Sequence, residues 1–193
     1  MRKGEQTKEY ILQKAAELFN ERGYYGASMA DIMALTGMEK GGIYNHFKSK
    51  DDLAVQAYEY AVDLMRQAFA AAIKGKYHAV DGLQAIVAVF QRIPSGSPLG
   101  GGCPVANTAV HAHKTHPRLY AYARETMIEW QDFIRRIVQL GIERGQLKPD
   151  TDVEMLTTLL ISTLEGAIML TQLHQDESYM NRAIAHLTSH LQS

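Results

Sequence analysis

Residues 28–50 constrain the fold more than any other part of this 193-residue chain, because two short helical patterns meet there at a tight turn. Ser28 followed three residues later by Asp31 resembles a capping box, which predicts that a helix begins at the next residue. Gly37 can adopt the positive φ that ends such a helix. A second helix is expected over residues 40–47, with its apolar positions on one face. The stretch therefore has the sequence pattern of a helix-turn-helix.

The exposed face of the second helix indicates a contact with nucleic acid. Its lysines can neutralise phosphates, and its two glycines permit close approach to a DNA backbone. We expect Lys40 and Asn45 to read base edges, because asparagine is suited to adenine. Tyr44, His46 and Lys50 are expected to contact phosphates, whereas the alternative is an ordinary solvated helix. The candidate DNA-binding residues are Ser28, Lys40, Gly41, Gly42, Tyr44, Asn45, His46, Lys48 and Lys50.

A family resemblance rests on an ordered set of features across residues 7–53. These features are Ala15-Ala16-Glu17-Leu18-Phe19, Arg22-Gly23-Tyr24, Ser28-Met29-Ala30-Asp31-Ile32, Thr36-Gly37 and the run over residues 40–53. Taken in this order they resemble the DNA-binding domain of the TetR family of one-component bacterial transcriptional regulators. The sequence departs from the family pattern at Gly42, where a small hydroxyl residue is usual, and at Glu39, where many relatives carry a better helix cap.

The resemblance implies an all-α fold with two domains. Residues 1–50 would form a three-helix helix-turn-helix DNA-binding domain, and residues 51–193 a larger helical domain for effector binding and dimerisation. The implied protein is a homodimeric repressor that a small molecule or electrophile releases from a palindromic operator. Two alternatives stay open. One is an activator or architectural DNA binder without effector control, and the other is a helical small-molecule-binding or interaction module.

Caps and helical spacing predict a series of helices along the chain. They are expected at residues 8–22, 50–74, 80–93, from 104 onward, 117–144, 153–173 and 178–191. No loop composition interrupts residues 50–74, so a continuous helix should join the DNA reader to the rest of the chain. A small tilt of that helix would change the spacing of two recognition helices in a dimer.

Several residues are candidates for an effector pocket or sensor. Pro104 predicts a helix start with Cys103 at the N-cap, where the helix dipole favours a thiolate, and some relatives sense electrophiles or oxidants in this region. The alternative for Cys103 is a buried core thiol. Core packing is likewise the alternative for the aromatic candidates, and an ion-pair or hydrogen-bond role for Glu165. The full set is Phe90, Cys103, Asn107, His111, Trp130, Phe133, Glu165 and Met169.

The segment at residues 153–173 is apolar nearly all the way round, so its own domain and a second chain should cover it from opposite sides. In the family the last two helices pair with their symmetry mates in a four-helix bundle. We therefore expect a dimer interface that contains Leu156, Leu160, Leu164, Met180, Ile184, Leu187 and Leu191.

Composition and charge limit the remaining possibilities. A hydrophobic content of 46% suits a packed core, and a single cysteine excludes an intramolecular disulfide. The net charge of −1 divides into +2 over residues 1–50 and −3 beyond them. The sequence carries no secretory signal pattern and no long uninterrupted apolar run, so we expect a soluble cytoplasmic protein without a membrane partner. Three of its eight histidines, at residues 111, 113 and 116, do not share one helix face, and no catalytic, metal or cofactor motif is recognised.

Overall fold

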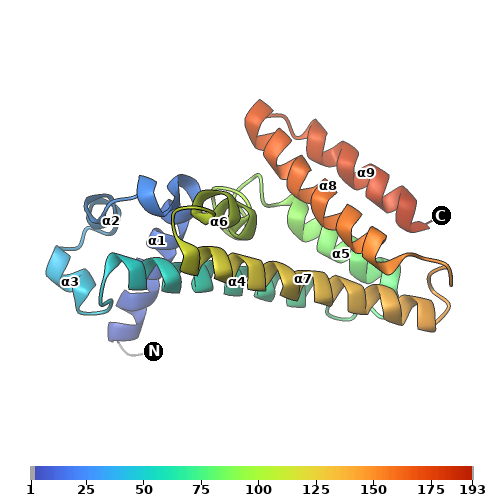
Figure 1. The fold of residues 1–193 in the computed structure, drawn as a ribbon, viewed down its shortest axis with the longest axis horizontal. Coiled ribbons are helices and arrows are strands. Elements are labelled where there is room, and N and C mark those ends of the chain that lie inside the picture. Colours follow the sequence, from blue (N-terminus) through green and yellow to red (C-terminus); the bar gives the residue numbers. More distant parts are fainter. Residues whose placement is uncertain (1–2, 193) are drawn as a thin grey trace. The chain divides into compact units, whose positions relative to one another are not determined.

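The computed structural model describes residues 3–192 of the chain, and within this range the ordered elements are α-helices without a strand (Figure 1). This confirms the predicted all-α class. The helices are α1 (Lys3–Gly26), α2 (Met29–Thr36), α3 (Lys40–Tyr44), α4 (Lys50–Ile73), α5 (Ala79–Gln91), α6 (Pro104–Ala112), α7 (Pro117–Glu143), α8 (Val153–His174) and α9 (Ser178–Gln192).

The chain forms two compact units whose boundaries do not follow the chain in one cut. Unit 1 runs up to Met65 and takes in residues 99–124, so that it holds α1–α3, the first part of α4, α6 and the start of α7. Unit 2 comprises residues 66–98 and the chain from Glu125 onward. The functional division at residue 50 stays a prediction. By packing, the helix-turn-helix shares its unit with α6.

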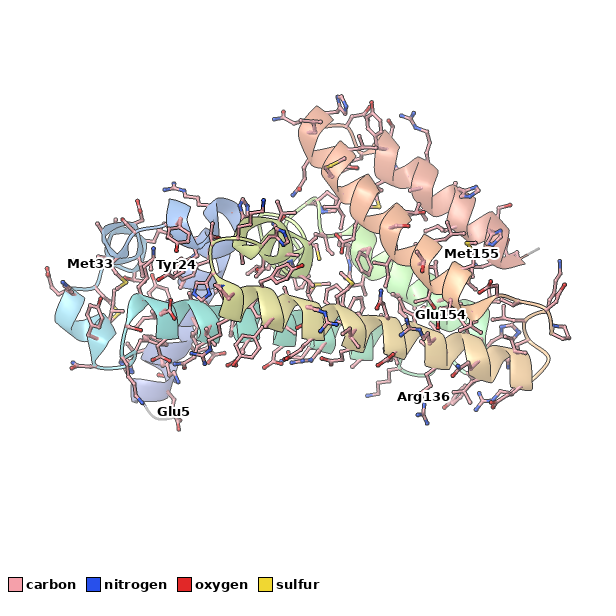
Figure 2. All side chains as sticks on the ribbon, viewed as in Figure 1. Glu5, Tyr24, Met33, Arg136, Glu154 and Met155 are labelled. Carbon is pink, nitrogen blue, oxygen red and sulfur yellow. The ribbon has the colours of Figure 1, made fainter. Side chains whose placement is uncertain are left out.

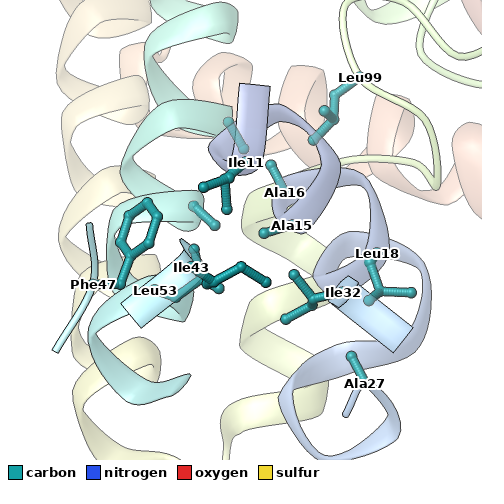
Figure 3. Packing of buried hydrophobic residues seen from close by; sticks show 12 residues of the cluster. Ile11, Ala15, Ala16, Leu18, Ala27, Ile32, Ile43, Phe47, Leu53 and Leu99 are labelled. Carbon is teal, nitrogen blue, oxygen red and sulfur yellow. The ribbon is translucent and has the colours of Figure 1, made fainter. Parts of the chain in front are cut away.

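The core of unit 1 is built from small and branched side chains of several helices (Figure 3). Ile32 of α2 and Ile43 of α3 are fully buried, and Phe47 just beyond α3 is 1% exposed. Leu99 joins the same cluster from the segment before α6. Because the two short helices bury so few residues each, these anchors hold them against α1 and α4.

Local chemistry sets the ends of the two short helices. The predicted capping box is present, since Asp31 N–H donates to Ser28 Oγ and Ser28 N–H donates to the Asp31 carboxylate. Gly37 closes α2 with a φ of 68°. The second helix is shorter than expected and ends at Tyr44. There the amides of His46 and Phe47 both turn back to the Ile43 carbonyl, which tightens the chain into turns before Phe47.

The first helix is longer than expected and contains a break. Gly23 has a φ of 69° and a ψ of 170° inside α1, so the predicted stop falls at the right residue although helical turns resume after it. A Cβ at Gly23 would lie 2.9 Å from Cγ of His111 on α6. The glycine therefore serves both the break and the close packing of α6.

In unit 2, α8 packs against α9, and both contact α5 (Figure 1). Asp152 caps α8 as expected, because its carboxylate accepts from the amide of Met155 at 2.9 Å. By length and composition alone α8 could cross a membrane, and 39% of its most apolar window is buried in the protein. Core helices of soluble proteins have the same composition.

Candidate nucleic-acid interface

The short helix α3 presents most of its predicted DNA-binding residues to solvent. Its buried anchor is Ile43, so that the polar side chains of the helix and of the turn after it face outward. Exposed members of the predicted set are Ser28, Lys40, Gly41, Tyr44, Asn45 and Lys48, and half-buried members are Gly42, His46 and Lys50. The surface combines cations, an amide and a phenol, which are groups that can contact phosphates and base edges.

Lys40, Tyr44 and Ser28 of the predicted DNA-binding set have partners within the helix-turn-helix. The ammonium of Lys40 lies 5.7 Å from the ring centroid of Tyr44, one turn further along. Ser28 Oγ is committed to the cap, since it lies 2.5 Å from Asp31 Oδ2. Hydrogen bonds from the Ser28 side chain and backbone lower the pKa of Asp31. The cap therefore stays ionised and fixes the start of α2.

Lys50 is placed differently from the lysines of α3. Its Nζ donates to the Tyr24 carbonyl at 2.7 Å and lies 4.2 Å from the centroid of the Tyr24 ring. Partial burial lowers its pKa. The ammonium therefore joins the end of α1 to the start of α4. Its contact with a DNA phosphate stays a prediction, and it would use the N–H groups that Tyr24 does not occupy.

A buried histidine extends this junction to α7. His116 Nδ1 accepts from the Leu119 amide at 3.1 Å, so the ring proton sits on Nε2, which lies 2.9 Å from Asp51 Oδ1. Tyr24 packs edge-on against the same imidazole, with ring centroids 4.6 Å apart. One side chain thus caps α7 and ties it to the second residue of α4.

The ionisation of Asp51 and Tyr24 reflects this arrangement. Burial alone raises the pKa of Asp51, but hydrogen bonds from His116 and Tyr24 outweigh it, and the net shift is downward. Burial, with the hydrogen bond to Asp51 second, raises the pKa of Tyr24 to about 12. Both hydrogen bonds favour the ionised form of Asp51, because both oxygens of a carboxylate are then free to accept.

A pair of asparagines fastens α1 to the glycine-rich segment before α6. Asn20 Nδ2 donates to the carbonyls of Gly100 and Gly102 at 2.6 and 2.9 Å. Asn107 Nδ2 reaches Asn20 Oδ1 at 3.0 Å and the Gly101 carbonyl at 2.7 Å. Asn20 is only 5% exposed, so these bonds satisfy groups that water does not reach.

The predicted sensor residues in unit 1 have different surroundings. Cys103 occupies the N-cap of α6 as expected, and it is 1% exposed. Asn107 belongs to the asparagine pair, and His111 is exposed beside Gly23. A reagent in solution cannot reach the Cys103 thiol unless the segment before α6 opens. Its role as a sensor stays a prediction.

In unit 2, three of the predicted pocket residues contact the ring of Phe69, which was not among the predicted residues. Phe69 of α4 has ring centroids of Phe90, Trp130 and Phe133 within 5.6, 5.2 and 6.5 Å. Of the other two, Glu165 is half-buried and Met169 is 59% exposed on α8. The available signal was helical spacing, because Phe69 stands four residues after Met65 and seven after Val62, and all three are apolar.

The residues expected at a dimer interface lie mostly inside their own chain. Leu160, Leu164 and Met180 are no more than 2% exposed, and of the seven predicted residues only Ile184 is half-buried rather than buried. Helix α8 is apolar on two faces, and its larger leucines pack toward α5 and α9, so the predicted interface at these residues stays a prediction. These side chains are therefore not available to a second chain in this structure.

The opposite face of α8 carries the exposed apolar residues. We name it the α8 seam: Met155, Leu159, Ser162, Gly166, Met169 and Leu173. Met155, Leu159 and Leu173 are 58%, 42% and 71% exposed. The spacing alternates between four and three residues, which is the pattern of a helix that packs along a partner helix, with two small residues at its centre.

Several residues that were not predicted as site residues hold the helices of the DNA-binding region in place. Tyr24, Asp51 and His116 join three helix ends, and Asn20 holds α6 to α1. His116 had a sequence signal, because it stands directly before Pro117 where a helix cap is expected. Asn20 had none, since its partners lie 80 or more residues away in the chain.

Family models and known proteins match the chain along most of its length. The model described as "Bacterial regulatory proteins, tetR family" matches residues 11–57, and the "Tetracyclin repressor-like, C-terminal domain" matches residues 79–187. The HTH-type transcriptional repressor DhaR of a Mycobacterium species is 24% identical over 177 residues, covering 91% of this chain and 87% of that protein.

Solved structures extend the comparison to the whole fold. A TetR transcriptional regulator from Chloroflexus aurantiacus is 42% identical, with a TM-score of 0.94 over 100% of this chain and 98% of the other. The regulator CifR, solved with 26-bp operator DNA, is 22% identical, with a TM-score of 0.78 over 91% and 93% of the two chains, which shows the shared fold alone. The matched proteins are regulators of transcription rather than enzymes. The chain therefore belongs to the tetR family of bacterial regulatory proteins.

Proposed function

We propose that this protein is a cytoplasmic, homodimeric repressor that a ligand releases from a palindromic operator. The observation that carries the proposal is the outward face of α3, where Lys40, Tyr44 and Asn45 are exposed above the buried Ile43. A repressor among the relatives, DhaR, supports the direction of regulation. In a two-fold dimer the two α3 helices would enter major grooves about one helical turn, ~34 Å, apart or a small multiple of it.

The roles within α3 follow from chemistry and exposure. Lys40 and Asn45 would read bases, and Tyr44, His46 and Lys48 would hold phosphates. Gly41 would let the helix approach the DNA backbone, because nothing in residues 3–192 beyond its own helix lies within 4 Å of the place of its missing side chain. Gly42 differs, since a Cβ there would meet Met38 Cε at 3.1 Å.

Dimerisation would use the α8 seam in place of the buried leucines. A monomer that exposes Met155, Met169 and Leu173 on one helix face leaves a contiguous apolar strip in water. Ser162 and Gly166 would let the backbones of two α8 helices approach closely. Two copies in antiparallel contact would bury the strip and fix the distance between the two DNA readers.

Ligand control would act through α4, which contributes residues to both units. Its first turn carries Lys50 and Asp51, which hold the ends of α1 and α7 through Tyr24 and His116. A ligand that favours one position of α4 over another would change operator affinity by its difference in affinity for the two states.

The test uses the full chain and the DNA upstream of its own coding region. We expect a saturable mobility shift with two chains per site, competed by the same DNA and not by a scrambled fragment. Gly41→Ala should keep the thermal midpoint of wild type, because the space is open and alanine favours helix, yet lower operator affinity about tenfold or more. Equal binding to scrambled DNA would favour an architectural protein. Absence of any shift would favour the interaction module.

A further inference from the structure

A groove on unit 2 lies between α4 and α7 and has a volume of about 750 Å³. This size falls within the range of small-molecule sites in proteins. Helix α4 contributes Arg66, Phe69, Ala70 and Ile73, and α7 contributes the other lining residues, which are Glu129, Trp130, Asp132, Phe133, Arg135, Arg136 and Gln139. All of them belong to unit 2.

The floor of the groove consists of the aromatic rings of Phe69, Trp130 and Phe133, and Phe90 packs against two of them from outside the lining. Trp130 stands edge-on to Phe69 and Phe90, at centroid distances of 5.2 and 6.0 Å and interplanar angles of 89° and 88°. Trp130 is 4% exposed, and its Nε1–H is buried without an acceptor among the described residues. The floor is therefore apolar except for the Trp130 N–H. A buried N–H without a partner is costly, so an acceptor on a ligand would be favourable there.

The charges on the rim are paired with one exception. Arg66 holds Glu129 through two bonds of 2.9 and 2.6 Å, and the hydrogen bond lowers the pKa of that carboxyl. Arg135 bonds Asp132 at 2.6 Å and also Glu154, at 2.7 and 2.9 Å. Both acidic residues of the groove therefore have an arginine partner, and Asp132 shares its arginine with Glu154 of α8.

Arg136 is the cation that remains. It is exposed on α7, where Figure 2 labels its side chain. No hydrogen bond or ion pair joins its guanidinium to another residue in the described part of the chain. Three arginines and two acidic residues line the groove, a formal sum of +1, and Glu154 outside the lining shares Arg135 with Asp132. An apolar aromatic floor beside one unpaired guanidinium is complementary to an amphipathic anion, since guanidinium binds carboxylate through two parallel hydrogen bonds.

We infer that the α4–α7 groove binds a small amphipathic carboxylate, with its apolar part on the aromatic floor and its carboxylate at Arg136. A cationic ligand is disfavoured because Glu129 and Asp132 already have arginine partners. The inference rests on the proposed function in that it gives the ligand-responsive regulator its ligand class. The Arg66–Glu129 pair bridges α4 and α7 at the rim, so an occupant that separates the two helices would act on it directly.

The chain provides its own reporter, because Trp130 is its single tryptophan. We would titrate the full-length protein with decanoate, 1-decanol and decyltrimethylammonium, each below its micelle-forming concentration, and record tryptophan emission. Decanoate should give a saturable change, and it should bind at least about fivefold more tightly than the alcohol or the cation. Equal affinity for the three head groups would overturn the inference.

Two variants separate the charge from the cavity. Arg136→Gln should weaken decanoate binding about tenfold and leave 1-decanol unchanged, because it removes the charge from an exposed side chain. Arg124→Gln changes an exposed arginine of the same helix outside the groove, and it should bind decanoate like wild type. Ala70→Phe, at an exposed position on the groove wall, should abolish both. Wild-type decanoate affinity in Arg136→Gln would contradict the assignment.

The fluorescence titration contains no DNA, so it is independent of the proposed function. Decanoate binding in a protein that ignores its upstream DNA would remove the repressor and keep the groove. Operator binding in a protein whose tryptophan does not respond to decanoate would remove the groove assignment and keep the repressor.

Discussion

Two glycines of unit 1 resist substitution for different reasons. Gly101 has a φ of 89°, and a Cβ there would lie 2.8 Å from Glu21 Cγ, 3.1 Å from the Glu21 amide nitrogen and 3.2 Å from Asn20 Nδ2. Gly37 has a φ of 68°, but outside its own chain neighbours no atom of the described residues lies within 4 Å of its missing side chain. The two glycines therefore separate the cost of strain from the cost of a clash.

We expect Gly101→Ala to lower the free energy of unfolding by about 3 kcal/mol, because it combines backbone strain with loss of the Asn20 hydrogen bonds. Gly37→Ala should cost about 1 kcal/mol, from strain alone. Urea denaturation followed by circular dichroism measures both. Equal losses in the two variants would show that the approach of Gly101 to α1 contributes nothing.

The residues that sequence reasoning placed correctly are those whose partners are near in the chain. Ser28 and Asp31 are three residues apart, and Cys103 stands beside Pro104, so their caps follow from local rules. The Asn20–Asn107 contact spans 87 residues, and no local pattern predicts it. Lys50 illustrates the same limit. Its positive charge suggested a phosphate contact, whereas its ammonium donates to the carbonyl of Tyr24, which lies 26 residues earlier.

At the scale of elements, the contact between α4 and the start of α7 depends on the ionised carboxylate of Asp51. The pKa of Asp51 is lowered in the folded protein, so its contribution to stability is present above its ordinary value of about 3.9 and is lost as pH falls through the lower folded value. The side chain is 50% exposed, so solvent screening limits the contribution to less than about 1 kcal/mol.

Asp51→Asn should therefore lose stability at pH 7 and show a smaller further loss than wild type between pH 5 and pH 3. Chemical denaturation at those three pH values, with Asp63→Asn as a control on an exposed part of α4, gives the difference directly. An identical acid response in Asp51→Asn and wild type would mean that the bond to His116 adds no stability.

Helix α8 shows why element-level patterns left the interface undecided. Its periodicity predicted a helix, and the bounds are within one residue of expectation. Both faces of the helix are apolar, however, and composition does not say which face its own domain covers. Packing against α5 and α9 decides that, and it selects the face of Leu156, Leu160 and Leu164.

For the whole molecule, the exposed seam makes association measurable without disturbing the core. Leu159→Glu together with Met169→Glu places charges on exposed positions of the α8 seam and should convert a dimer to a monomer with unchanged helix content. Gln172→Glu, exposed on α8 outside the seam, should remain dimeric. Sedimentation velocity measures the state of each. A dimer in the double variant would place the interface elsewhere.

The exposed α8 seam links operator occupancy to the concentration of the protein. If only paired chains occupy the operator, then below the dissociation constant of the pair the bound fraction rises with the square of the chain's concentration. Halving the amount of protein would then cut occupancy about fourfold. Leu173, at 71% exposure, would meanwhile leave each unpaired chain open to aggregation. Helix α8 would thereby turn gradual changes in synthesis into steeper changes in repression.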